Sequence, residues 1–81
     1  MPYFEFLWTK ESVRHLAEHG VSPQDFEHVV LHSVYRGRSR RSMLPVAWGY
    51  TSDGRYIIAV YEHVDELTVI PVTAYEVPEP K

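Results

Sequence analysis

The residues most able to do chemistry are four arginines in one short stretch, Arg36, Arg38, Arg40 and Arg41. Arg36, Arg38 and Arg40 are spaced by two, so on a strand their side chains would share one side, with Cα atoms roughly 6.5–7 Å apart. That spacing is close to the separation of phosphates along a nucleic-acid strand, and a guanidinium donates two parallel hydrogen bonds to a phosphate. The stretch is therefore predicted to bind RNA.

A simpler interpretation is that these arginines are solvated charges on a loop or edge strand, where they would block aggregation. The formal net charge of the chain is −3, and without those four positive charges it would be −7. The chain is thus an acidic body with one basic segment. Four arginines in six residues are unusual in such a body, which favours the phosphate-binding interpretation.

A second group of residues has the side chains that a ribonuclease needs. Cleavage requires a base for the 2′-hydroxyl, an acid for the leaving oxygen and a cation for the charged transition state. The candidate base is Glu62 or His63. The candidate cation is Arg38, Arg40 or Arg55, and Tyr75 could position the phosphate. The alternative is a solvated strand end for Glu62 and His63, and packing on the sheet for Tyr75.

Two histidine pairs are spaced by four residues, His15 with His19 and His28 with His32. Such pairs can chelate a metal, and a metal-binding regulator built on the first pair is a third, weaker hypothesis. No third ligand is evident and no His-Glu-x-x-His motif occurs, so no metal and no cofactor are predicted. The chain has no cysteine, which excludes disulfides and a cysteine nucleophile.

These residues must be positioned by helices and strands, and the sequence pattern predicts that those elements form one α+β domain over residues 1–77. A flexible tail is predicted at 78–81. Hydrophobic residues make up 44% of the chain and charged residues 23%, which is typical of a globular domain. Strands and helices do not alternate, so two short helices packed on an antiparallel sheet of four to five strands are expected, in the order β-α-α-β-β-β-β. The predicted strands are 3–8, 34–41, 45–51, 55–62 and 67–77, and the predicted helices are 10–19 and 23–32.

The first helix has a clear start and end in the sequence. Thr9 is the expected N-cap, and Gly20 stands where a left-handed residue ends a helix. Val13, Leu16 and Ala17 have the spacing of a buried stripe.

The second helix carries the clearest local signal. Ser22 is the expected N-cap, Pro23 the first helical residue and Asp25 the partner in a capping box. Val21 and Phe26 can form a hydrophobic staple.

The strand region also contains local signals for a turn, a central strand and a bulge. The Asp-Gly dipeptide at 53–54 predicts a type I′ hairpin turn. Residues 55–62 are apolar on both faces, as in a central strand, and Pro71 predicts an edge strand or a bulge. Trp8 and Trp48 are expected in the core; the less favoured alternative is that they stack against a nucleic-acid base.

Four segments form a recognisable pattern: Phe6-x-Trp8, His19-Gly20-Val21-Ser22-Pro23, Phe26-Glu27, and Gly54-Arg55 followed by the apolar run at 56–60. The pattern resembles the BrnT family, small toxins of bacterial type II toxin–antitoxin pairs that are similar in fold to RelE-type ribonucleases. The resemblance extends to about Tyr75. It implies a metal-independent endoribonuclease, blocked by a cognate DNA-binding antitoxin, with Arg55 and the strand arginines at matching places.

Two departures from the family pattern support a different hypothesis. Family members continue after the last strand with an arginine-rich helix, which has no counterpart in this sequence. They also have an arginine at the end of that strand, where this sequence has Tyr75. The alternative is a catalytically inactive interaction module, homodimeric, that binds RNA or an acidic protein partner without cleavage.

The sequence also predicts where the protein acts. No basic flank and apolar segment typical of a signal peptide is visible, and no apolar run approaches the ~18 residues of a membrane span. The lack of cysteine is typical of a reducing compartment. A cytoplasmic location without membrane contact is expected.

Overall fold

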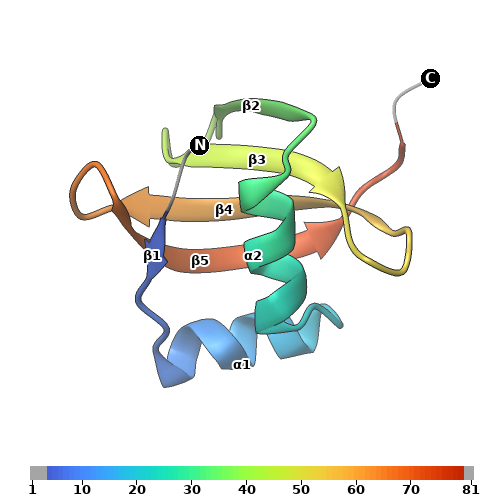
Figure 1. Cartoon of the computed structure of the whole chain (residues 1–81), viewed down its shortest axis with the longest axis horizontal. Coiled ribbons are helices and arrows are strands. Elements are labelled where there is room, and N and C mark those ends of the chain that lie inside the picture. Colours follow the sequence, from blue (N-terminus) through green and yellow to red (C-terminus); the bar gives the residue numbers. More distant parts are fainter. Residues whose placement is uncertain (1–3, 80–81) are drawn as a thin grey trace.

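The computed structural model describes residues 4–79, and in it two helices lie on one face of a five-stranded sheet (Figure 1). This confirms the predicted α+β class and the order β-α-α-β-β-β-β. The elements are β1 (Glu5–Phe6), α1 (Lys10–Glu18), α2 (Pro23–Leu31), β2 (Tyr35–Arg38), β3 (Pro45–Tyr50), β4 (Tyr56–His63) and β5 (Thr68–Glu76).

The spatial order of the strands is β1-β5-β4-β3-β2. Strands β2 to β5 are antiparallel as predicted, but β1 pairs with β5 in parallel, so the sheet is mixed. β1 is also shorter than the predicted strand 3–8, whose first residue lies outside the described part of the chain, as do residues 80–81 of the predicted tail. Pro78 and Glu79 are exposed and belong to no element.

The caps of α1 form as predicted. The Thr9 hydroxyl accepts a hydrogen bond from the Ser12 amide, and Gly20 has a left-handed φ of 70°. The Gly20 amide donates to the Ala17 carbonyl at 3.0 Å, and the Val21 amide donates to the Leu16 carbonyl at 2.9 Å. This Schellman motif turns the chain directly into α2.

The buried stripe of α1 differs from the prediction. Leu16 is fully buried, but Val13 is 40% exposed and Ala17 is exposed, and Ser12 is buried instead. The reason is that α1 packs along β5, where the Ser12 hydroxyl donates to the Pro71 carbonyl at 2.7 Å. A polar contact thus replaces part of the expected apolar one.

The second helix follows its sequence signals closely. The Ser22 hydroxyl accepts from the Asp25 amide at 3.1 Å, and Pro23 opens the helix. Phe26, Val29 and Val30 are fully buried against the sheet, at the i, i+3, i+4 spacing of a buried helix stripe.

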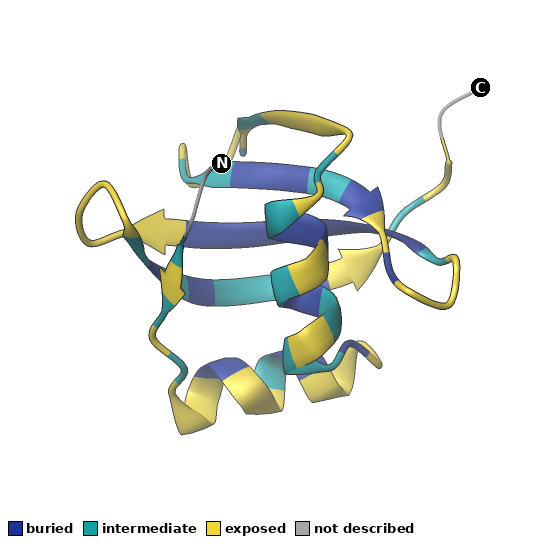
Figure 2. Cartoon of the chain, viewed as in Figure 1, coloured by how far each residue is buried: buried dark blue, intermediate teal, exposed yellow. Residues whose placement is uncertain are grey.

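Strand β4 runs through the centre of the sheet and is buried from Tyr56 to Tyr61 (Figure 2). Its alternate residues face two separate apolar clusters, one under the helices and one on the opposite face. The ladder to β5 shifts register between Val60 and Tyr61, opposite Pro71. The predicted bulge is confirmed, and Pro71 also lies beyond the pairing with β1, which includes only Thr68 and Val69, so no described strand pairs with this edge of β5 at the proline.

The hairpin after β3 is where the sequence places it, but its turn type was predicted wrongly. A type I′ turn needs positive φ at both central residues, and only Gly54 has one, at 90°. The Gly54 amide donates to the Thr51 carbonyl at 3.0 Å, so the loop has three residues, 52–54. The cause is the Asp53 carboxylate, which accepts from the Thr51 hydroxyl; this bond lowers the pKa of Asp53.

Arg55 joins this hairpin to the corner between the helices. Its guanidinium donates to the Gly20 carbonyl at 2.8 Å and to the Asp25 carboxylate at 3.2 Å, and it forms an ion pair with Asp53 at 3.3 Å. The arginine therefore holds together three segments that are distant in sequence.

Replacing Arg55 by Ala should lower the free energy of unfolding by about 1–2 kcal/mol, because three charged hydrogen bonds are lost but the pair is partly screened by water. The side chains of Arg55 and Asp25 are 30% and 17% exposed. The midpoint of urea unfolding measures the change. Arg14→Ala, on the exposed side of α1, is the matched control and should leave the midpoint unchanged; equal midpoints for both variants would show that the contacts are not stabilising.

Candidate functional site

The face of the sheet opposite the helices is not covered by any described element (Figure 1). It carries its own apolar cluster, in which Val46, Ile58 and Val60 are buried and Trp48 is partly buried. Val46 pairs with Val60 and Trp48 with Ile58 across the strands, and Leu44 and Val77 pack against the same cluster. The exposed apolar side chains at its border, Val34, Tyr35 and Tyr50, are accessible to a partner.

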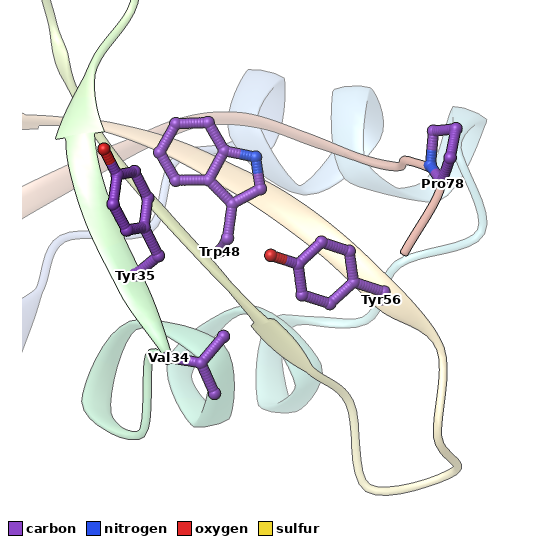
Figure 3. Close-up of a pocket in the computed structure, with 5 residues that line it drawn as sticks. All are labelled: Val34, Tyr35, Trp48, Tyr56 and Pro78. Atoms are coloured by element: carbon purple, nitrogen blue, oxygen red, sulfur yellow. The ribbon is translucent and has the colours of Figure 1, made fainter. Parts of the chain in front are cut away.

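Two adjoining hollows on this face form what we call the aromatic groove. The first has a volume of about 380 Å³ and is lined by Val34, Tyr35, Trp48, Tyr56 and Pro78 (Figure 3). The second shares Tyr35 and Trp48 with it and extends to Arg38 and Arg40. The groove thus runs from an aromatic end to a basic end.

Both tryptophans pack against apolar clusters, as predicted, but on opposite faces of the sheet. The Trp48 indole lies on the uncovered face, where its ring centroid is 5.0 Å from that of Tyr35. Trp8, in contrast, packs against the core under the helices, and its indole nitrogen donates to the Glu27 carboxylate at 2.8 Å. A run of alternating apolar residues cannot show which side of a sheet the helices will cover, so the sequence did not distinguish the two faces.

The arginine stretch does not form the predicted row. β2 ends at Arg38, so Arg40 and Arg41 lie in the turn that follows rather than on a strand of residues 34–41. The Arg38 guanidinium donates to the Met43 carbonyl at 3.1 Å, and Met43 itself has a φ of 60°, which closes the turn. Arg38, Arg40 and Arg41 together are called the arginine turn below.

No carboxylate neutralises the arginine turn. Among residues 4–79, the only ion pairs join Arg55 to Asp25 and Asp53. The side chains of Arg38, Arg40 and Arg41 are exposed, and Arg40 lines the basic end of the aromatic groove. This concentration of unpaired positive charge can attract a polyanion.

Arg36 has a different environment from the rest of the stretch. Its Nε donates to the Ser33 hydroxyl and its Nη2 to the Val30 carbonyl, both at 2.8 Å. The guanidinium carbon lies 5.6 Å from the centroid of the Phe4 ring. Three contacts therefore fix Arg36 near the end of α2, away from the arginine turn.

His63 lies close to the same ring as Arg36. The His63 ring centroid is 5.8 Å from that of Phe4 and 5.5 Å from that of Tyr61. Its Nδ1 is 3.1 Å from the Asp65 carbonyl oxygen. Because a carbonyl only accepts, Nδ1 carries the hydrogen, and Nε2 is left as the basic nitrogen of the neutral ring.

The neighbours of His63 have shifted acidities. Burial raises the pKa of the Tyr61 hydroxyl, and the positive charge of Arg36 partly offsets that shift. Amide donors of Leu67 and Thr68 lower the pKa of Asp65, which stays charged and holds the loop beside His63. Arg36, Tyr61 and His63, grouped around Phe4, are called the His63 cluster below.

The predicted catalytic residues are not brought together as one set. Arg55 precedes β4 and His63 ends it, so these residues are roughly 26 Å apart along an extended strand. Tyr75 pairs with Ile58, five residues from His63, or about 16 Å, and its ring lies 5.9 Å from that of His19. One phosphate cannot contact Arg55, Tyr75 and His63 together. Glu62 is exposed beside His63.

The second histidine pair predicted from the spacing lies side by side in the structure. The His28 and His32 rings are 4.8 Å apart at the end of α2. Within residues 4–79, no group of three or more metal-binding side chains occurs. No helix in that part of the chain is long and apolar enough to cross a membrane.

Sequence reasoning missed one member of the aromatic groove. Tyr35 was not singled out although it precedes the arginines directly and lines both hollows. Alternation with the arginines marked Tyr35 as facing the other side of its strand. Tyr61 is buried in the cluster under the helices, with Arg36 and His63 beside it.

Comparison with known proteins adds no assignment to this geometry. No protein-family model, no curated protein and no solved structure matches the chain.

Proposed function

We propose that the protein is an RNA-directed domain of the BrnT-like kind, which binds RNA through the arginine turn and cleaves it without a metal. The single observation that carries the proposal is the unneutralised charge of Arg38, Arg40 and Arg41 on a chain that is otherwise acidic. A protein that binds a polyanion is expected to concentrate positive charge at an exposed site such as this turn. The resemblance to BrnT toxins makes RNA the preferred polyanion.

The His63 cluster contains a base and a cation of the kind that metal-free cleavage of RNA requires. The free Nε2 of His63 can accept the proton of the 2′-hydroxyl, whose oxygen then attacks the adjacent phosphorus. The bond from phosphorus to the 5′-oxygen breaks, the leaving oxygen takes up a proton from solvent, and the products are a 2′,3′-cyclic phosphate and a 5′-hydroxyl. Arg36 can stabilise the added negative charge with its remaining N–H groups.

This arrangement narrows the roles suggested by the sequence. His63 is kept as the base, with Glu62 beside it as the second candidate. Arg55 is assigned to structure, since its donors contact Gly20, Asp25 and Asp53. Tyr75 is too far from His63 to hold the same phosphate.

A second candidate function is an interaction module that binds RNA or an acidic protein without cleavage, alone or as a homodimer. The observation that favours it is the separation of Arg55, Tyr75 and His63 described above. A DNA-binding antitoxin, the partner implied by the resemblance, would fit either function. An acidic segment of such an antitoxin would complement the arginine turn.

The cleavage proposal predicts a His63-dependent ribonuclease. Purified protein incubated with single-stranded RNA in EDTA should yield 2′,3′-cyclic phosphate ends. His63→Ala should lower the rate by about 10²–10⁴-fold, because the general base is removed. The rate and the end groups are measured by gel electrophoresis and mass spectrometry.

His28→Ala is the matched control, because it removes an exposed histidine from α2 and should cut at the wild-type rate. No products from the wild type, with RNA binding retained, would reject cleavage in favour of the interaction module. Equal rates for wild type and His63→Ala would reject the assignment of the base.

The binding proposal predicts a strong dependence on salt. Each phosphate contact with a single strand contributes about 0.7 to the slope of log affinity against log salt. Arg38→Ala, Arg40→Ala and Arg41→Ala combined should therefore lower the magnitude of that slope by about 2. Fluorescence anisotropy with a labelled oligonucleotide at several salt concentrations measures it.

Arg14→Ala serves as the control here as well, since it changes the net charge but not the arginine turn. An unchanged slope in the triple variant would mean that the phosphates are held elsewhere.

A further inference from the structure

We propose that the aromatic groove binds the unpaired bases of single-stranded RNA by stacking, while the arginine turn holds the phosphates beside them. The inference rests on the proposed RNA binding but not on cleavage. It assigns a function to Tyr35 and Trp48, which lie on the face of the sheet that the helices leave open.

Two pairs of aromatic rings lie next to each other along β3, on the same face of the sheet. The rings of Tyr35 and Trp48 have centroids 5.0 Å apart, and those of Tyr50 and Tyr56 are 4.9 Å apart. Trp48 and Tyr50 are two residues apart on β3 and face the same side, which separates the pairs by roughly 7 Å. That distance is close to the spacing of successive nucleotides in an extended strand. Roughly two bases can therefore stack, as on other RNA-binding sheets.

The exposure of Tyr35 fits binding better than core packing. Tyr35 is 63% exposed and Val34 is 61% exposed, at the mouth of the hollow seen in Figure 3. Tyr50 is exposed as well, whereas Tyr56 is buried against it. Each ring is already held against a cross-strand neighbour, so binding a base costs little additional ordering. A base can stack on Tyr35 or on Tyr50 because every base has a flat apolar surface.

The two ends of the groove carry opposite charges, which would orient a bound polyanion along it. Arg38 and Arg40 border one end. At the other end, the Tyr50 hydroxyl donates to the Glu79 carboxylate at 3.3 Å, and Pro78 closes the hollow. The phosphate backbone is therefore attracted to the arginine turn and repelled beyond Tyr50. A duplex does not fit this scheme, because its bases are already stacked and paired.

The test uses a labelled 2′-O-methyl hexauridylate, which cannot be cleaved because its 2′-oxygen is blocked. Anisotropy should show that Tyr35→Ala binds it at least about tenfold more weakly than the wild type, the loss expected for one base–aromatic stack. Tyr35→Phe, which keeps the ring, should bind within about twofold of the wild type. A uridine strand of about 20 nucleotides, long enough to stay paired with its complement, should bind at least about tenfold more weakly as the duplex than as the single strand.

Leu67→Ala is the control for removing an exposed apolar side chain outside the groove, and it should bind like the wild type. Equal binding by Tyr35→Ala and the wild type would overturn the proposal, as would equal affinity for the duplex. So would sedimentation that shows a wild-type dimer lost in Tyr35→Ala, since the groove would then hold a second copy of the chain. Salt-dependent binding that needs the arginines but not Tyr35 would leave the RNA-binding function intact and reject the stacking site alone.

Discussion

The fold depends on one constraint: β4 is apolar on both faces, but residues 4–79 form only two short helices, and both lie on the same side. The helices bury one side of β4 beneath Phe26, Val29 and Val30. The other side is covered by neighbouring side chains of the sheet and its flanking segments, Leu44, Trp48, Val72 and Val77. No helix lies over this face, so the exposed side chains at its border stay accessible. The structural solution for β4 therefore also creates the surface on which a partner can bind.

Local signals in the sequence determined much of the fold. The caps at Thr9 and Ser22, the left-handed Gly20 and the central strand formed as predicted, because each depends on residues a few positions apart. One error occurred where a distant segment decides: the stripe of α1 rotated because the Ser12 hydroxyl found a carbonyl on β5. The other was local. The hairpin took a three-residue loop because Asp53 bonds to Thr51 and Arg55, a choice that the Asp-Gly dipeptide alone does not reveal.

The candidate site was less predictable than the fold, for a similar reason. A spacing of two places arginines on one side only while the strand continues, and β2 ends at Arg38. Which arginines are free is decided by partners from elsewhere in the chain: Val30 binds Arg36, and Asp25 binds Arg55. Sequence reasoning could find the basic segment from its charge alone. It could not separate arginines that support the fold from arginines that remain available.

That separation also explains how an acidic protein can bind a polyanion. At physiological ionic strength the field of a charge is screened beyond about 8 Å, so a phosphate at the arginine turn is influenced by nearby charges rather than by the net charge of the chain. Arg38, Arg40 and Arg41 have no carboxylate within ion-pair distance among residues 4–79, while Asp25 and Asp53 are held by Arg55. The acidic remainder would then repel nucleic acid from the rest of the surface. In the proposed function, the negative net charge therefore does not oppose RNA binding but restricts it to one turn and to the groove beside it.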